Sequence, residues 1–207
     1  DMENNGNEVD TNLARRVSTE FSVQETLLKL LISKCEPEQR DITEALTSHV
    51  FKSCHIYRDL GRADSASLSL TRLRSLVQIF QQRGTTYSPN LPMILRLEDA
   101  KLLKCQNDLD TAVMHCKIIS NHLSSSEDAE TNIERDSLLA DSLLLGSLWM
   151  AEQNVDTAPS ILSSFQKASR LSMEVHTKAK AMGASHTASS IRKASIAGFK
   201  LGEFAAS

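Results

Sequence analysis

The sequence has little glycine, proline or aromatic residue: its 207 residues include 7 Gly, 4 Pro and 1 Trp, and aromatic residues make up 4%. So few turn formers argue against a turn-rich sheet protein and favour long, uninterrupted helices. No apolar run approaches the roughly 20 residues that a bilayer-spanning helix needs. No charged start followed by a hydrophobic run marks a secretory signal. We therefore expect an all-α, soluble, intracellular protein with no membrane partner.

Neither sign of charge forms a long run, and the formal net charge is −3. A basic patch, the usual electrostatic mark of nucleic-acid binding, is missing from the sequence. We therefore expect no direct contact with nucleic acid. The four cysteines lie in stretches of helical apolar periodicity rather than in a short disulfide framework: Cys35, Cys54, Cys105 and Cys116. Buried, reduced thiols are the favoured interpretation.

Residues 93–120 have the pattern of a helical hairpin. Two apolar amphipathic segments flank a short polar turn at residues 106–108. Helices joined by so short a turn lie antiparallel, as in one unit of a tetratricopeptide (TPR) repeat. Such a unit cannot bury its apolar faces alone and needs neighbouring helices. The pattern therefore predicts antiparallel helical hairpins stacked as a TPR/HEAT-like α-solenoid, a scaffold rather than a catalyst.

Three further helices are predicted before this hairpin. The first begins near Ser22, which has capping-box spacing to Glu25, and ends before Glu36 and Pro37. Apolar or small residues recur at helical spacing from Ile42 to Tyr57, and Gly61 follows as a C-terminal cap. The next helix has Asp64 as its N-cap and ends at Gly84. Its apolar stripe is expected to contain Leu68, Leu73, Leu76, Val77 and Phe80.

Three more helical segments are predicted after the hairpin. The Leu-rich stretch at residues 138–150 has an apolar surface wide enough to face two neighbours, and its Trp149 is expected to be buried. Pro159 falls in the first turn of the next helix, where it removes no intrahelical bond. One face of this helix is expected to carry Ile161, Leu162, Phe165, Ala168, Leu171 and Val175. A last apolar pattern occupies residues 191–204 and resembles an unpaired helix with an exposed apolar face. Its basic residues Arg192 and Lys193 are interpreted as solvated surface charges.

The polar residues form no convincing reactive cluster. The order of Cys105, His115, Cys116 and His122 fits no structural zinc pattern, so helix-face and core roles are favoured over metal binding. Cys54 and His55 are neighbours in one helix and diverge by about 100°, which prevents a nucleophile–base hydrogen bond.

The carboxylates, glycines and serines do not indicate a catalytic or ligand-binding site either. Glu98 and Asp99 are interpreted as solvated charges, with a weak pair between Glu98 and Lys101, rather than as a general acid and base. The glycines lie singly, so no phosphate-binding loop is present. Residues 124–126 are serines followed by Glu127 and Asp128, a context that suits an acid-directed kinase, but a plain surface loop is favoured. The sequence assigns no catalytic, cofactor-binding or metal-binding residue.

The two ends of the sequence differ from its middle. Residues 1–20 are poor in apolar side chains at their start and are expected to be a disordered lead-in. The first residue is Asp1 rather than Met, and the last apolar pattern continues to the end of the chain. We therefore expect residues 21–207 to be part of a longer helical-repeat domain, truncated at its C-terminal end.

The order of several motifs resembles a known kinase family, the ATM-type kinases of the phosphatidylinositol-kinase-related group. The similar stretches are QRDI at 39–42, LTSH at 46–49, LEDAK at 97–101 with Asp110 and Ala112, LWMAE at 148–152, and the pattern from Lys193 to Ala205. They cover most of residues 22–205 in the family's order. The LEDAK stretch and the residues after it are similar to the recurrent helical hairpin of the family's FAT region.

The resemblance implies that residues 21–207 are a partial FAT-like domain of a nuclear serine/threonine kinase acting in the DNA-damage response. It implies a scaffold that packs on and regulates a kinase domain and contributes to a homodimer. ATP and Mg²⁺ would bind in that kinase domain, whose motifs have no counterpart in these residues. A stand-alone TPR-like adaptor that binds a partner helix or peptide is the alternative. An enzyme in its own right would need a convergent polar cluster, which we do not find.

Overall fold

A computed structural model describes residues 40–82, 89–125, 132–153, 158–181 and 193–200, and the isolated positions 19, 26 and 202. Within these residues every regular element is a helix, which confirms the predicted all-α class. The chain forms two compact units, Asp1–Ser88 and Pro89–Ser207, which are taken in turn. Nearly all of the predicted lead-in, and of the helix predicted to begin near Ser22, lies outside the described residues. None of the described helices is long and apolar enough to cross a membrane.

The first unit contains helices α2 (Arg40–Asp59) and α3 (Ala63–Gln82), which pack against each other. They are joined by a tight turn at Gly61, whose φ of 69° is the left-handed conformation that glycine tolerates best. The Gly61 N–H donates to the Arg58 carbonyl and the Arg62 N–H to the Tyr57 carbonyl, at 2.9 and 2.8 Å. These two bonds define a Schellman cap and confirm the predicted role of Gly61.

The interface between α2 and α3 is formed by one stripe from each helix. Its most buried apolar side chains are Val50, Cys54, Tyr57, Ala66, Leu70, Leu73 and Val77. The prediction for Leu68 was wrong, because 52% of this residue is exposed. Leu70, two positions later, takes the buried place. The predicted N-cap role of Asp64 was wrong, because α3 already begins at Ala63 and Asp64 lies within its first turn. The side chains of Leu76 and Phe80 lie outside the described residues.

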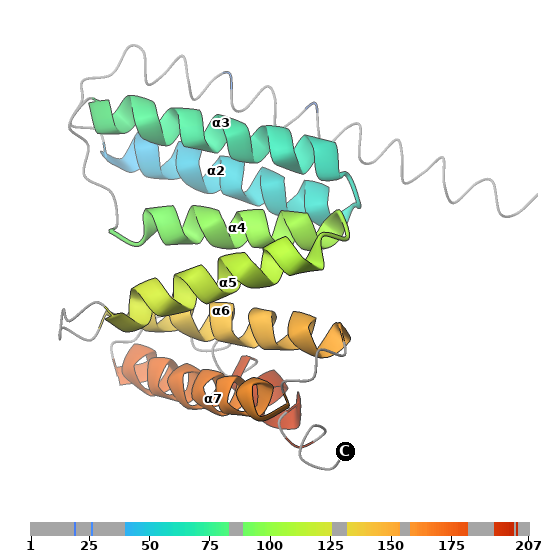
Figure 1. Cartoon of the computed structure of the whole chain (residues 1–207). Coiled ribbons are helices and arrows are strands. Elements are labelled where there is room, and N and C mark those ends of the chain that lie inside the picture. The colour runs from blue at the N-terminus through green and yellow to red at the C-terminus, as the bar shows by residue number, and fades with distance from the viewer. Residues whose placement is uncertain are drawn as a thin grey trace, which may run out of the picture. The chain divides into compact units, whose positions relative to one another are not determined.

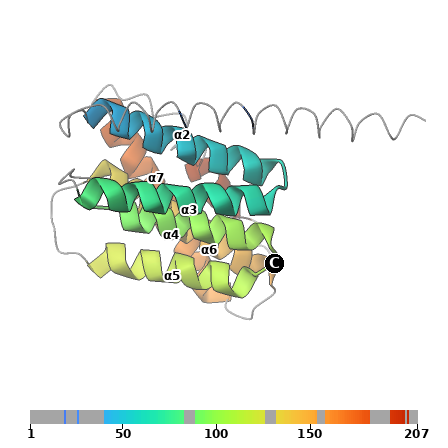
Figure 2. The same cartoon turned by 90° about the horizontal axis from the view of Figure 1, so that it is seen from above.

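The second unit contains α4 (Leu91–Cys105), α5 (Leu109–Ser125), α6 (Ile133–Glu152) and α7 (Ala158–Ala181), followed by a helical segment at residues 193–200. Each helix packs on the next one in the chain, while α4 touches α6 only at a few places. Figure 1 shows this succession from α4 to α7, and Figure 2 shows α4 and α5 side by side from above. The predicted hairpin at residues 93–120 is therefore present.

Polar contacts fix the directions of these helices. The start of α6 meets the end of α5, where the Arg135 Nε donates to the Leu123 carbonyl at 3.0 Å. The end of α6 meets the start of α5, where the Gln153 amide donates to Asp110 at 2.8 Å. Thus α5 and α6 are antiparallel. Lys178, near the end of α7, pairs with Asp136, near the start of α6, at 3.0 Å, so α6 and α7 are antiparallel as well.

The turn between α4 and α5 repeats the chemistry of the first unit. Asn107 has a φ of 63°, and its N–H donates to the Lys104 carbonyl, while the Asp108 N–H donates to the Leu103 carbonyl. This is again a Schellman cap, here with asparagine in the left-handed position. The Asp108 carboxylate then accepts from the Thr111 N–H at 3.2 Å and caps α5. The polar turn predicted at residues 106–108 is confirmed.

Small residues let α5 and α6 approach closely. A Cβ atom at Gly146 would lie 3.0 Å from the Cβ of Cys116 across the interface. One turn away, the hydroxyls of Ser120 and Ser142 hydrogen-bond at 3.0 Å. On other sides of α6, Trp149 is 5% exposed and Leu144 is 6% exposed. The predicted wide apolar surface of this helix is thus occupied by α5 and α7, and the predicted burial of Trp149 is confirmed.

Helix α7 buries the stripe expected of it. Pro159 lies in its first turn, and Ile161, Phe165, Ala168 and Val175 are at most 3% exposed. The following segment at residues 193–200 buries Ala194 and Ala197. Its apolar residues Ile196 and Phe199 are 38% and 65% exposed, as expected for a helix with an exposed apolar face.

Candidate functional site

A groove of about 580 Å³ opens between α4, α6, α7 and residues 193–200. We call it the α4–α6 groove. Its apolar lining consists of Ile94, Leu97, Ile133, Leu138 and Val175. The volume falls in the range of about 300–1,000 Å³ typical of ligand pockets, which are also mostly apolar. The groove is therefore the candidate binding site of this unit.

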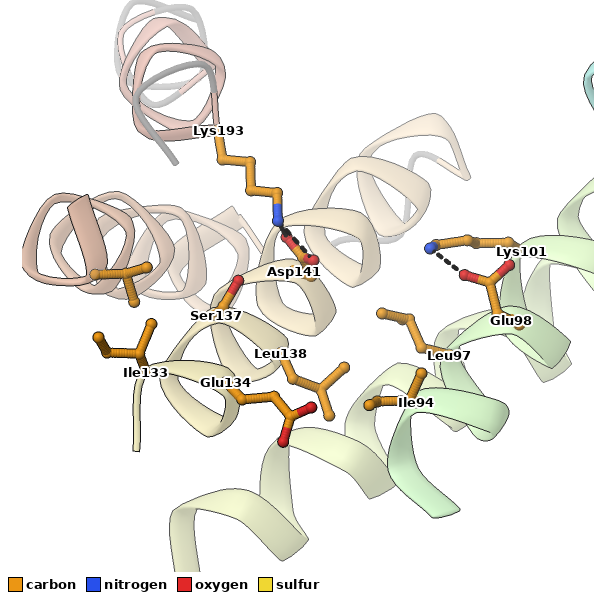
Figure 3. Close-up of a pocket in the computed structure, with 11 residues that line it drawn as sticks. Ile94, Leu97, Glu98, Lys101, Ile133, Glu134, Ser137, Leu138, Asp141 and Lys193 are labelled. Atoms are coloured by element: carbon orange, nitrogen blue, oxygen red, sulfur yellow. Dashed lines mark hydrogen bonds and ion pairs between the residues drawn. The ribbon is translucent and has the colours of Figure 1, made fainter. Parts of the chain in front are cut away.

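The apolar lining lies between two ion pairs. On one side, Lys193 reaches from the helical segment to Asp141 of α6 at 2.6 Å. On the other, Lys101 pairs with Glu98 on α4 at 2.5 Å. Figure 3 shows both pairs, with Leu138, Leu97 and Ile94 between them. Both lysines are thus held by carboxylates of the chain itself.

Helices α4 and α6 are held together near both of their ends. At their N-terminal ends, the Asn90 amide donates to the Glu134 carboxylate at 3.0 Å. At their C-terminal ends, Lys104 pairs with Glu152. The two helices are consequently parallel, with the antiparallel α5 packed on both. Asn132 fixes the start of α6 as well, because its side chain accepts from the N–H groups of Glu134 and Arg135.

The charges around the groove favour an apolar ligand. A phosphate or carboxylate ligand gains the most binding energy from a cation that is not already paired with a carboxylate. The cations that line the groove are Lys101 and Lys193, and each already pairs with a carboxylate. Among the residues that the structure describes, no three His, Cys, Asp or Glu side chains are placed to hold a metal ion. The groove therefore suits apolar side chains rather than a nucleotide.

The thiols and imidazoles weighed in the sequence do not converge. Cys116 is 1% exposed, whereas Cys105 and His122 are exposed, so the expectation of a buried thiol was wrong for Cys105. Burial raises the pKa of the Cys116 thiol from 9.0 to about 12, although the charge of Lys101 opposes this shift. Such a thiol stays protonated and is a poor nucleophile at neutral pH. Cys54 is likewise buried, while its neighbour His55 is exposed.

Two charged residues of the groove differ from their predicted environment. Glu98 was interpreted as a solvated charge, but it is 4% exposed, and its predicted pair with Lys101 is present and partly buried. Lys193 was interpreted as a surface charge, but it pairs with Asp141, which lies 52 positions earlier in the chain. A signal for the groove was present in α6, where Glu134, Leu138 and Asp141 share one helix face at spacings of four and three. Nothing in the sequence indicated which partner faces them.

Similarity to known proteins does not assign this chain to a family. No family model, curated protein or solved structure matches the chain.

Proposed function

We propose that this chain is a helical scaffold and regulatory segment of an ATM-type serine/threonine kinase of the DNA-damage response. It packs on a kinase domain that is not contained in these 207 residues and regulates that domain. In this proposal the described helices belong to a TPR/HEAT-like α-solenoid of the FAT type. ATP and Mg²⁺ bind the kinase domain, a second copy forms the homodimer, and the protein acts in the nucleus.

The observation that carries the proposal is the order of packing in the second unit. Each of α4, α5, α6 and α7 packs on its neighbour in sequence, and the direction reverses at every step from α5 to α7. Stacks in which each helix contacts mainly its neighbours are typical of helical-repeat scaffolds. The hairpin with the LEDAK motif, which carries the resemblance to the FAT region, lies at the start of this order.

The α4–α6 groove is the proposed contact surface for the kinase domain. Its apolar lining can contact the apolar side chains of a docking segment. Its two lysines already pair with carboxylates, so a charged small molecule would gain little binding energy from them. Docking that favours one of two kinase states shifts the kinase equilibrium by the difference in contact energy, typically about 1–3 kcal/mol. Catalysis then stays in the kinase domain while the helices bias its state.

Lysine-directed cross-linking of the endogenous protein tests this role. With the protein tagged in its own cells, Lys101 and Lys193 at the groove are expected to cross-link to lysines of a kinase domain in the same polypeptide. Lys180, which is exposed on α7, serves as the reference lysine outside the groove. Lys101→Arg and Lys193→Arg keep the charges but remove the reactive amines, and they should abolish these cross-links without changing those of Lys180.

A stand-alone adaptor is the second candidate, because an apolar groove also fits the apolar face of a partner helix. The same experiment separates the two candidates. Cross-links from Lys101 and Lys193 to a separate protein, with none to a kinase domain of the same chain, would reject the kinase proposal in favour of the adaptor.

A further inference from the structure

Two cationic side chains surround the C-terminal end of α5. The Lys167 Nζ, from α7, donates to the Ser124 hydroxyl at 3.2 Å. The Arg135 guanidinium, from α6, donates through its Nε and Nη2 to the carbonyl of Leu123, the residue before Ser124. Lys167 therefore contacts Ser124 itself, while Arg135 contacts the backbone of the preceding residue, so that cations from α6 and α7 meet at the end of α5.

Ser124 has the features of a modification site. It is exposed in the last turn of α5, where a helix unwinds at little cost. Glu127 stands three positions after it in the sequence and supplies the acidic context that suits an acid-directed kinase. The neighbouring Ser125 is less suitable, because its hydroxyl donates to the His122 carbonyl within the same helix and no described cation contacts it.

We infer that Ser124 is a phosphorylation site whose phosphate is bound by Lys167 and Arg135. The phosphate donor is ATP, used by an acid-directed serine kinase. The Ser124 oxygen bonds to the γ-phosphorus, the bond from that phosphorus to the β,γ-bridging oxygen breaks, ADP leaves, and the hydroxyl proton passes to the kinase's base. This inference is independent of the proposed function, because it concerns only α5, α6 and α7.

The two cations decide whether a phosphate on Ser124 stabilises or destabilises the end of α5. A phosphate at a helix C-terminus is normally unfavourable, because it meets the negative end of the helix dipole. Here Lys167 already contacts the oxygen that would carry the phosphate, and charge-assisted bonds are roughly twice as strong as neutral ones. The phosphate therefore ties the end of α5 to α7 and α6, and it stabilises the second unit rather than melting the last turn.

The first test is the modification itself. The full 207-residue chain is incubated with ATP and casein kinase 2 as the acid-directed kinase, and tandem mass spectrometry locates the phosphate. Phosphate on Ser124 is the expected result, with Ser124→Ala as the control that removes it. A native chain that carries no phosphate on Ser124 after this treatment would overturn the inference.

The second test measures the bound phosphate. Phosphoserine is incorporated at position 124 during translation, and ³¹P NMR follows its titration. Lys167 and Arg135 are expected to hold the second pKa of the phosphate below the value of the same chain unfolded in urea, and to raise the Tm by about 2–4 °C. Lys167→Met should remove most of both effects, whereas Lys180→Met, on an exposed lysine of the same helix, should leave them unchanged. An unshifted pKa or a lowered Tm in the wild-type background would contradict the inference.

Discussion

Gly146→Ala tests the close approach of α5 and α6. The new Cβ would lie 3.0 Å from the Cβ of Cys116, whereas carbon atoms in contact prefer about 3.5–4.0 Å. The helices must separate locally, and overpacking of this kind costs about 1–3 kcal/mol. The higher helix propensity of alanine opposes this loss and stabilises the folded state by about 1 kcal/mol relative to glycine. The net expectation is a loss of about 0–2 kcal/mol, which combines both effects.

Gly198→Ala is the matched control. Gly198 also lies in a helix, but a Cβ there would meet only the Ser169 Oγ at 3.9 Å, an ordinary contact. The control shares the propensity gain and lacks the clash, so Gly146→Ala should be less stable than Gly198→Ala by about 1–3 kcal/mol. Urea unfolding is followed by the fluorescence of Trp149, the one tryptophan of the chain, which is buried in the same unit.

A double-mutant cycle identifies the atoms responsible. Cys116→Ala keeps the Cβ that causes the clash, so it should not relieve Gly146→Ala. Cys116→Gly removes this Cβ and should show a favourable coupling of about 0.5–3 kcal/mol with Gly146→Ala. Equal stabilisation by Gly146→Ala and Gly198→Ala, or equal coupling with both Cys116 variants, would refute the reasoning.

Three further predictions concern the turn, the core and the buried thiol. Asn107→Ala should cost about 1–2 kcal/mol in urea unfolding, because alanine tolerates the left-handed conformation poorly, whereas Asn107→Gly should keep the stability. Trp149→Ala should cost about 3–5 kcal/mol by circular dichroism, because the indole is 5% exposed. The raised pKa of Cys116 predicts slow alkylation of its thiol at neutral pH, so that the exposed Cys105 reacts before Cys116. It also predicts that stability falls as pH rises from 9.0 toward about 12, where the unfolded thiol is ionised and the folded thiol is not.

Each of these predictions has an opposing outcome. Equal stability of Asn107→Ala and Asn107→Gly would show that the left-handed turn is not retained in solution. Unchanged unfolding of Trp149→Ala would place the indole at the surface. Cys116→Ala should flatten the alkaline loss of stability measured in the wild type, and an identical pH dependence of the two proteins would assign that loss to other groups.

The helices and their turns could be predicted because their signals are local. Gly61 and the polar residues 106–108 end their helices through backbone conformations that depend on a few neighbouring residues. The orientation of α3 was harder to predict, because Leu68 lies near Leu76 around the helix while Leu70 lies near Leu73 and Val77, so that the apolar residues cover a wide arc. Only the packing against α2 decides that Leu70 is buried and Leu68 is exposed.

The α4–α6 groove could be predicted only in part. The spacing of Glu134, Leu138 and Asp141 marks one face of α6, but the partners of that face come from distant segments. The contact between Lys193 and Asp141 spans 52 positions, so no local pattern contains it. The burial of Glu98 has the same origin, since a side chain on α4 is covered by helices that the local sequence does not specify.

The transcript that encodes this chain, read past Ser207 by long-read sequencing of messenger RNA, tests the central claim most directly. The proposed function predicts an open reading frame that continues into a kinase domain with the family's Asp-Arg-His catalytic loop and a metal-binding Asp. A stop codon directly after Ser207, with a start codon upstream of Asp1, would contradict the kinase proposal and leave the stand-alone adaptor in its place.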